Sequence, residues 1–184
     1  NVSGVTNMNF LFFSRIYFNE DISGWDVSNV TTMRNMFSGA VEFNQPLNSW
    51  NVSKVTNMNK MFESAMTFDQ PLNSWNVSKV ESMEKMFKNA TSFNQPLNSW
   101  NVSNVTDFSG MFENTNFNQS LVSWDTHSAQ SLSAMFSFDA SFNQPLNNSL
   151  LGLINLTHLT FGYEFNQPLN NFLLGLINLT HLTF

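Results

Sequence analysis

Three histidines and thirteen acidic residues are the side chains of this chain that could ligate a metal ion or transfer a proton. His158 and His181 lie 23 residues apart, each within the sequence LTHLTF, so stacked repeats could bring both within reach of one metal ion. The alternative is that the segment was duplicated and carries an outward-facing histidine twice. No Cys, Asp or Glu recurs beside the two histidines as a third ligand. The sequence therefore predicts no metal site and no cofactor.

Paired carboxylates could act as a general acid and a general base. The closest pairs are Glu20 with Asp21 and Glu81 with Glu84, and neither pair recurs through the chain. The sequence also lacks the motifs G-x-S-x-G, G-x-G-x-x-G and H-E-x-x-H and the phosphate-binding Walker loop. The absence of cysteine excludes thiolate zinc ligands and cysteine nucleophiles. We predict that the chain is not an enzyme.

The charge of the chain argues against two classes of partner. Its formal net charge is −6, and every Lys and Arg lies between Arg15 and Lys88. This distribution disfavours binding to nucleic acid and docking on an anionic membrane. No apolar run reaches the ~18 residues that a transmembrane helix needs, so we expect no membrane insertion in this segment. The 42% of hydrophobic residues, including 20 Phe, excludes a disordered chain.

The residues that could build a core recur with one period. Tryptophan returns every 25 residues, with a last step of 24, at Trp25, Trp50, Trp75, Trp100 and Trp124. Two phenylalanine series keep the same register: Phe12, Phe37, Phe62, Phe87, Phe112 and Phe136, and Phe18, Phe43, Phe68, Phe93, Phe117, Phe142 and Phe165. A full unit reads FNQPLNSWNVSKVTNMNKMFESAMT at residues 43–67. The chain is therefore an array of repeats.

The spacing within a unit separates an extended segment from a helical one. Trp50 and Val52 alternate with Asn51, which places the two apolar side chains on one face of a strand and Asn51 on the other. The next apolar residues are spaced by 3, 4 and 3, as in one stripe of a short helix: Val55, Met58, Phe62 and Ala65. The unit predicts an α/β repeat solenoid, a right-handed coil like that of leucine-rich repeats. Each 23–25 residues would form one short parallel strand and one short helix or helical turn.

Two kinds of unit divide the chain. Residues 1–141 form an array of 25-residue units, and residues 142–184 carry shorter 23-residue units that continue the same solenoid. Neither end looks like a polar capping repeat, so we expect a fragment of a longer protein without caps. Exposed apolar surface at Phe10–Phe13 and Leu173–Phe184 would then favour end-to-end self-association.

The repeat units resemble two known families. WNVSKVTNMNKMF at 50–62 and WNVSKVESMEKMF at 75–87 are similar to the units of BspA-like leucine-rich-repeat surface proteins, which include mycoplasma-type surface lipoproteins. LTHLTFGYEFNQPLNN at 156–171 resembles the FNIP repeat of social amoebae and of giant viruses of amoebae. The resemblances imply a solenoid, and for many BspA-like members surface display with adhesion or protein binding. The location of the protein stays open. A bacterial source would imply the cell surface or secretion, and an amoebal or giant-virus source would allow a location inside the cell.

The expected strand face supplies the candidate binding residues. It carries one polar residue per unit, at Asp26, Asn51, Asn76, Asn101 and Asp125. A row of amides suits an extended polar partner, and we predict a non-catalytic scaffold for protein or glycan binding, acting in adhesion or surface interaction. The alternative is an architectural spacer array with no specific ligand on this segment. The column Asn44, Asp69, Asn94, Asn143 and Asn166 could likewise face a ligand, or could form an internal asparagine ladder that satisfies backbone groups.

Overall fold

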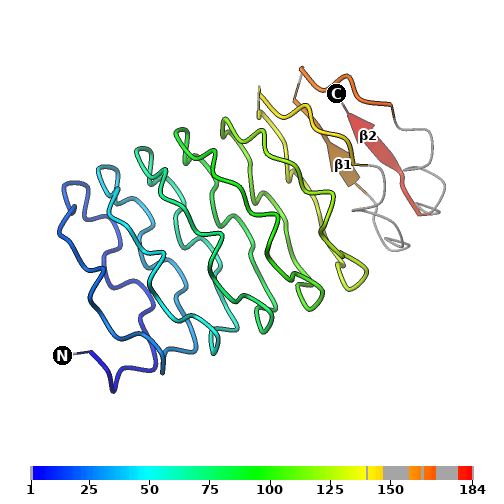
Figure 1. Cartoon of the computed structure of the whole chain (residues 1–184). Helices are drawn as coiled ribbons and strands as arrows, with labels where there is room; N and C mark the ends of the chain where they lie inside the picture. The colour runs from blue at the N-terminus through cyan, green and yellow to red at the C-terminus, as the bar shows by residue number, and fades with distance from the viewer. Residues whose placement is uncertain (1, 140, 147–157, 163, 169–177, 184) are drawn as a thin grey trace.

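Successive units of the chain are stacked as coils along one axis (Figure 1). The computed structural model describes residues 2–139, 141–146, 158–162, 164–168 and 178–183. From Asn7 to Ser131, neighbouring coils are joined at one isolated parallel β-bridge each, and the bridged residues follow the repeat: Asn7, Thr32, Asn57, Ser82, Asp107 and Ser131. The repeat period read from the sequence is thus the length of one coil.

The described strands lie near the C-terminal end of the stack. They are β1 (His158–Thr160) and β2 (His181–Thr183), which pair in parallel with His158 opposite His181 (Figure 1). Both belong to the region 142–184, where the sequence has its shorter units. The two histidine positions are therefore neighbours in the backbone register.

The α/β fold class predicted from the spacing is wrong, because the expected helix is absent from the part of each unit that the structure describes. The described residues contain no helix, and their strands are three residues long. In the unit at residues 43–67, residues 58–61 and 62–65 form two turns, and a third turn over 60–63 overlaps both. Lys60 and Ser64, the third residues of the first two turns, have φ of 57° and 58°. A positive φ at every fourth residue interrupts a right-handed helix, although the apolar spacing is the same.

Hydrogen bonds between coils replace those of the expected helix. The N–H groups of Lys60, Phe62 and Ser64 donate to carbonyl groups of the next coil at 2.7 to 2.9 Å, on Glu84, Met86 and Lys88 respectively. Stacking thus gives these donors partners that an isolated unit lacks. Because every second N–H in this segment points to the next coil, the segment does not wind into a helix.

The strand expected at Trp50–Val52 is also absent. Turns close over residues 47–50 and 52–55, and the bridge of this coil lies further on, at Asn57. The alternation of apolar and polar residues at 50–52 reflects burial on one side of an extended segment that makes no ladder. The described part of the chain holds no helix with the length and apolar character of a membrane span.

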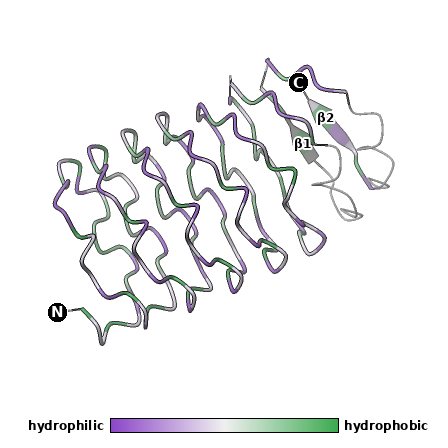
Figure 2. Cartoon of the chain, in the orientation of Figure 1, coloured by the Kyte–Doolittle hydropathy of each residue, from purple (hydrophilic) through white to green (hydrophobic). Residues whose placement is uncertain are grey.

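The core confirms the inward faces predicted from the sequence. All six apolar residues assigned to the inward faces of the expected strand and helix are buried: Trp50, Val52, Val55, Met58, Phe62 and Ala65. Rings of the two phenylalanine series stack within a coil at 3.8 to 4.1 Å between centroids. Across coils the centroids are 5.5 to 6.3 Å apart. Hydrophobic and hydrophilic residues consequently alternate along the described parts of the coils (Figure 2).

The first coil leaves apolar side chains exposed. Phe10, Leu11 and Phe13 are 49%, 46% and 48% exposed. This agrees with the expected apolar surface at Phe10–Phe13, while residues 173–177 and 184 of the other expected surface lie outside the described residues. End-to-end association stays a prediction.

Candidate polar groove

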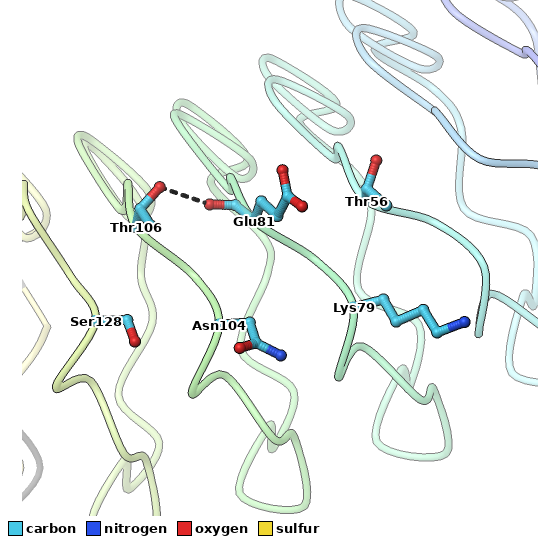
Figure 3. A pocket seen from close by; sticks show the side chains of 6 residues that line it. All are labelled: Thr56, Lys79, Glu81, Asn104, Thr106 and Ser128. Atoms are coloured by element: carbon cyan, nitrogen blue, oxygen red, sulfur yellow. Dashed lines mark hydrogen bonds between the residues drawn. The ribbon is translucent and has the colours of Figure 1, made fainter.

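A polar groove with a volume of about 550 Å³ crosses several coils of the stack. Its lining consists of six polar side chains, which we call the polar groove: Thr56, Lys79, Glu81, Asn104, Thr106 and Ser128. Figure 3 shows Lys79, Asn104 and Ser128 along one edge and Thr56, Glu81 and Thr106 along the other. The groove thus runs from coil to coil and suits an extended ligand better than a compact one.

The repeat itself builds the two edges. The residues of one edge occupy the third position of the motif V-S-x-V-x in successive units, and those of the other edge occupy the fifth position. The residue between them is buried, as at Val80 and Val105. Turns close over 77–80 and 102–105, and the polar side chains on either side of the buried valine are exposed or half-buried.

Hydrogen bonds to the preceding coil hold part of the lining in place. Thr106 Oγ1 donates to the Glu81 carbonyl oxygen at 3.0 Å (Figure 3), and Asn104 Nδ2 donates to the Ser78 carbonyl oxygen at 2.8 Å. Among the described residues, Lys79 and Glu81 form no ion pair within 4.0 Å, and both are exposed. The groove therefore offers hydroxyl and amide groups with one charge of each sign.

The five residues predicted as the binding row do not line the polar groove. All five are exposed, one to each coil, and each accepts a backbone hydrogen bond from the residue two positions later: Asp26, Asn51, Asn76, Asn101 and Asp125. These donor–acceptor distances are 3.1 to 3.2 Å. Asn and Asp favour such turns because a short side-chain oxygen reaches the backbone N–H. The row therefore has a local structural role, and its role in binding stays a prediction.

Two members of that row have perturbed acidity. Hydrogen bonding to His127 holds the pKa of the Asp125 carboxyl below its ordinary value, and the distance from His127 Nδ1 to Asp125 Oδ1 is 2.7 Å. Hydrogen bonding from Ser28 lowers the pKa of Asp26. Donors that favour the charged form are the cause in both cases.

The asparagine column of the F-N-Q-P motif forms a ladder of hydrogen bonds, as one of the two interpretations predicted. Asn94 Oδ1 accepts from the Asn118 N–H at 2.9 Å and from Gln119 Nε2 at 3.1 Å. The same pattern starts from the side-chain oxygens of Asn19, Asn44, Asp69, Asn118 and Asn143. The column is exposed or half-buried, so the expectation that it is internal is wrong.

Sequence reasoning missed the polar groove. The signal was present as the two variable polar places that flank the buried valine of V-S-x-V-x. Each place looks like an ordinary solvated position within one unit, because only stacking brings four units together.

No candidate metal centre emerges from the described residues, which contain no group of three His, Cys, Asp or Glu side chains close enough to share an ion. His181 Nδ1 lies 2.9 Å from Thr180 Oγ1. The predicted absence of a metal site stays a prediction.

One family profile matches the sequence. It carries the description "Mycoplasma protein of unknown function, DUF285" and matches residues 1–100 and 70–172. A comparison with curated proteins gives no match.

Proposed function

This chain belongs to the family of Mycoplasma proteins of unknown function DUF285, and from that premise we propose that it is a non-catalytic binding scaffold. Its ligand would be an extended and largely uncharged polymer, a glycan or a peptide strand, held across several coils. The observation that carries the proposal is the polar groove, whose six lining residues come from successive coils.

The chemistry of the polar groove favours a neutral ligand. Its lining has one ammonium group, on Lys79, and one carboxylate, on Glu81, so the charges cancel. Hydroxyl and amide groups can both donate and accept, as recognition of sugar hydroxyls or of a peptide backbone requires. A phosphate polymer would need a cluster of Lys and Arg instead.

Family membership also supports a finer assignment. We infer that the 25-residue units are of the BspA-like type and that the C-terminal units are FNIP-like, on the motifs WNVSKVTNMNKMF and LTHLTFGYEFNQPLNN. On that assignment the chain would be displayed at a cell surface and act in adhesion.

A second candidate function is an architectural spacer. It is favoured by the local use of the row residues, because the Oδ1 atoms of Asn51, Asn76 and Asn101 accept hydrogen bonds from their own turns. A polar surface that is repeated for turn formation needs no ligand.

A glycan and peptide array probed with the 184-residue chain separates the two functions. The groove variant combines Lys79→Asn, Glu81→Thr and Asn104→Ala, of which the first two introduce residues that other coils have at the same place. We expect the groove variant to lose about tenfold or more in affinity for the ligand found. A matched control, Asn51→Ala with Asn76→Ala and Asn101→Ala, should bind like the wild type.

Each outcome has one interpretation. Loss of binding in the control but not in the groove variant would move the site to the row of turn residues. An array without any bound glycan or peptide would favour the spacer.

A further inference from the structure

One carboxylic acid lies inside the stack. Asp139 is fully buried, at a place that other coils fill with a fully buried alanine: Ala40, Ala65 and Ala90. The coil before it carries the buried Thr115 at the corresponding place. Two polar residues thus face each other where the three coils before them have only methyl groups.

The Thr115 hydroxyl has three polar neighbours. Its oxygen Oγ1 lies 2.9 Å from the Phe112 carbonyl oxygen and 3.1 Å from Asp139 Oδ2, and it accepts from the Phe117 N–H at 3.3 Å. A hydroxyl carries one proton, and the Phe112 carbonyl can only accept. If Thr115 donates to Phe112, the proton between Thr115 and Asp139 must come from the acid.

The remaining hydrogen-bond donors to Asp139 are backbone N–H groups. Oδ1 accepts from the Ser141 N–H at 3.0 Å, as the carbonyl oxygen of a carboxylic acid would, and the Phe142 N–H also donates to this carboxyl group. Oδ2 is then the hydroxyl oxygen that donates to Thr115. With Asp139 ionised, either the Phe112 carbonyl or the contact between Oδ2 and Thr115 would lack a proton, which is costly in a buried site.

No charged residue is among the causes that act on the Asp139 carboxyl group. Glu113, in the coil of Thr115, is paired with Lys88 at 2.9 Å, and Glu164, which follows Phe161 as Asp139 follows Phe136, is exposed. The side chains that contact or adjoin Asp139 from its own coil and the preceding one, Thr115 and Ser141, are neutral. Burial is the main cause that raises the pKa of Asp139 to about 7, against the lowering effect of its hydrogen bonds.

We propose that Asp139 is a protonated acid in the folded protein and that its ionisation weakens the packing of its coil against the coil of Thr115. This contact, which we call the Asp139–Thr115 joint, lies where the 25-residue units give way to the shorter ones. It makes the contact between these two coils sensitive to pH, independently of any ligand in the polar groove.

Asp139→Asn provides the matched variant, because the amide has nearly the same shape, stays neutral and can donate to Thr115 through Nδ2. Urea unfolding of both proteins would be followed from pH 5 to pH 8. The unfolding equilibrium constant of the wild type should rise by about a hundredfold relative to the variant over this interval, since the folded state holds a proton that the unfolded state has lost. Parallel pH profiles of the two proteins would overturn the proposal.

A direct titration of the wild type covers the case in which Asp139→Asn fails to fold. The ¹³C carboxyl resonance of Asp139 would be assigned by loss of the signal in Asp139→Ala, which restores the residue of the earlier coils. We expect a titration midpoint near pH 7, and a midpoint near pH 4 would overturn the proposal.

Discussion

The indole N–H of Trp75 donates a 2.9 Å hydrogen bond to the backbone carbonyl of Leu47, one coil earlier. The same bond joins Trp50 to Ile22, Trp100 to Leu72 and Trp124 to Leu97, at 3.2, 2.9 and 3.0 Å. A buried indole N–H needs an acceptor, and the Leu47 carbonyl, which also accepts the turn hydrogen bond from the Trp50 N–H, supplies one. This explains why the column is tryptophan and not phenylalanine.

Truncation of Trp75 tests this contact. Trp75→Ala should cost ~3–5 kcal/mol of the free energy of unfolding, because a large buried side chain is lost. Trp75→Phe keeps most of the packing and removes one hydrogen bond, while the Leu47 carbonyl keeps its bond from the Trp50 N–H, so the cost should be ~0.5–1.5 kcal/mol. Urea unfolding measures both values. Asn76→Ala, at the exposed neighbour, is the control and should cost less than ~1 kcal/mol; a cost equal to that of Trp75→Ala would contradict the assigned inside and outside.

The asparagine ladder is tested at Asn94. Only its side-chain oxygen accepts hydrogen bonds from the next coil, and the equivalent Asp69 makes the same bonds with a carboxylate. Asn94→Asp should therefore be tolerated at neutral pH. Asn94→Ala removes the acceptor of two hydrogen bonds and should cost ~1–3 kcal/mol in urea unfolding. Equal stability of the two variants would show that the oxygen is not what the column requires.

Gly39 and Gly4 provide a matched pair of positions that tests whether the backbone conformation requires glycine. Gly39 has φ of +73°, and a Cβ atom there would lie 3.3 Å from the Cα of Ser14 in the preceding coil, whereas a Cβ at Gly4 would meet nothing within 4 Å. Gly39→Ala should lower the melting temperature through a loss of ~1–2 kcal/mol, because alanine is strained at this φ. Gly4→Ala should leave it nearly unchanged. A harmless Gly39→Ala would mean that the turn can relax.

The lowered pKa of Asp125 predicts how the stability of the protein changes at acidic pH. The hydrogen bond to His127 lowers its pKa, so its contribution to stability is present above the ordinary pKa of 3.8 and is lost as the pH falls through the folded value. His127→Ala should raise the pKa of Asp125 toward 3.8, measured by NMR titration of the carboxyl carbon. An unchanged pKa would place the cause in the backbone N–H of residue 127.

The buried Asp139 makes stability depend on pH in the opposite direction. Its pKa is raised from 3.8 to about 7, so its contribution is full below 3.8 and is lost as the pH rises toward 7. At 1.36 kcal/mol for each pKa unit this loss is about 4 kcal/mol. Calorimetric melts of wild type and Asp139→Asn should therefore diverge as the pH rises through this interval, and curves that stay parallel would contradict the assigned sign.

The sequence was sufficient to predict which residues are buried. Positions such as Trp50, Val55 and Phe62 recur with the period of the unit, and a column that is apolar in every coil can only face a shared core. It was not sufficient to predict secondary structure, because spacings of 3 and 4 fit both a helix and two successive turns. Asn35, Gly39 and Asn89 were a weak signal for the turns, since Gly and Asn tolerate positive φ.

For the candidate sites too, the sequence predicted one part and only the structure revealed the rest. The row of Asn51 and its equivalents is exposed, as predicted, but only the structure reveals that each side chain closes its own turn. The polar groove needs four units side by side, and no single unit contains it. The Asp139–Thr115 joint pairs residues 24 positions apart that sequence reasoning passed over.

The sequence by itself determined the period, the inward columns and the lack of a recurring catalytic or metal-ligating constellation, because these depend on residue type and spacing alone. The tertiary structure decided where the backbone hydrogen bonds go and which polar side chains meet. The physical reason is that Lys60, Phe62 and Ser64 have carbonyl partners only in the next coil. A unit that would be helical by its apolar pattern becomes a run of turns once its neighbour supplies those acceptors.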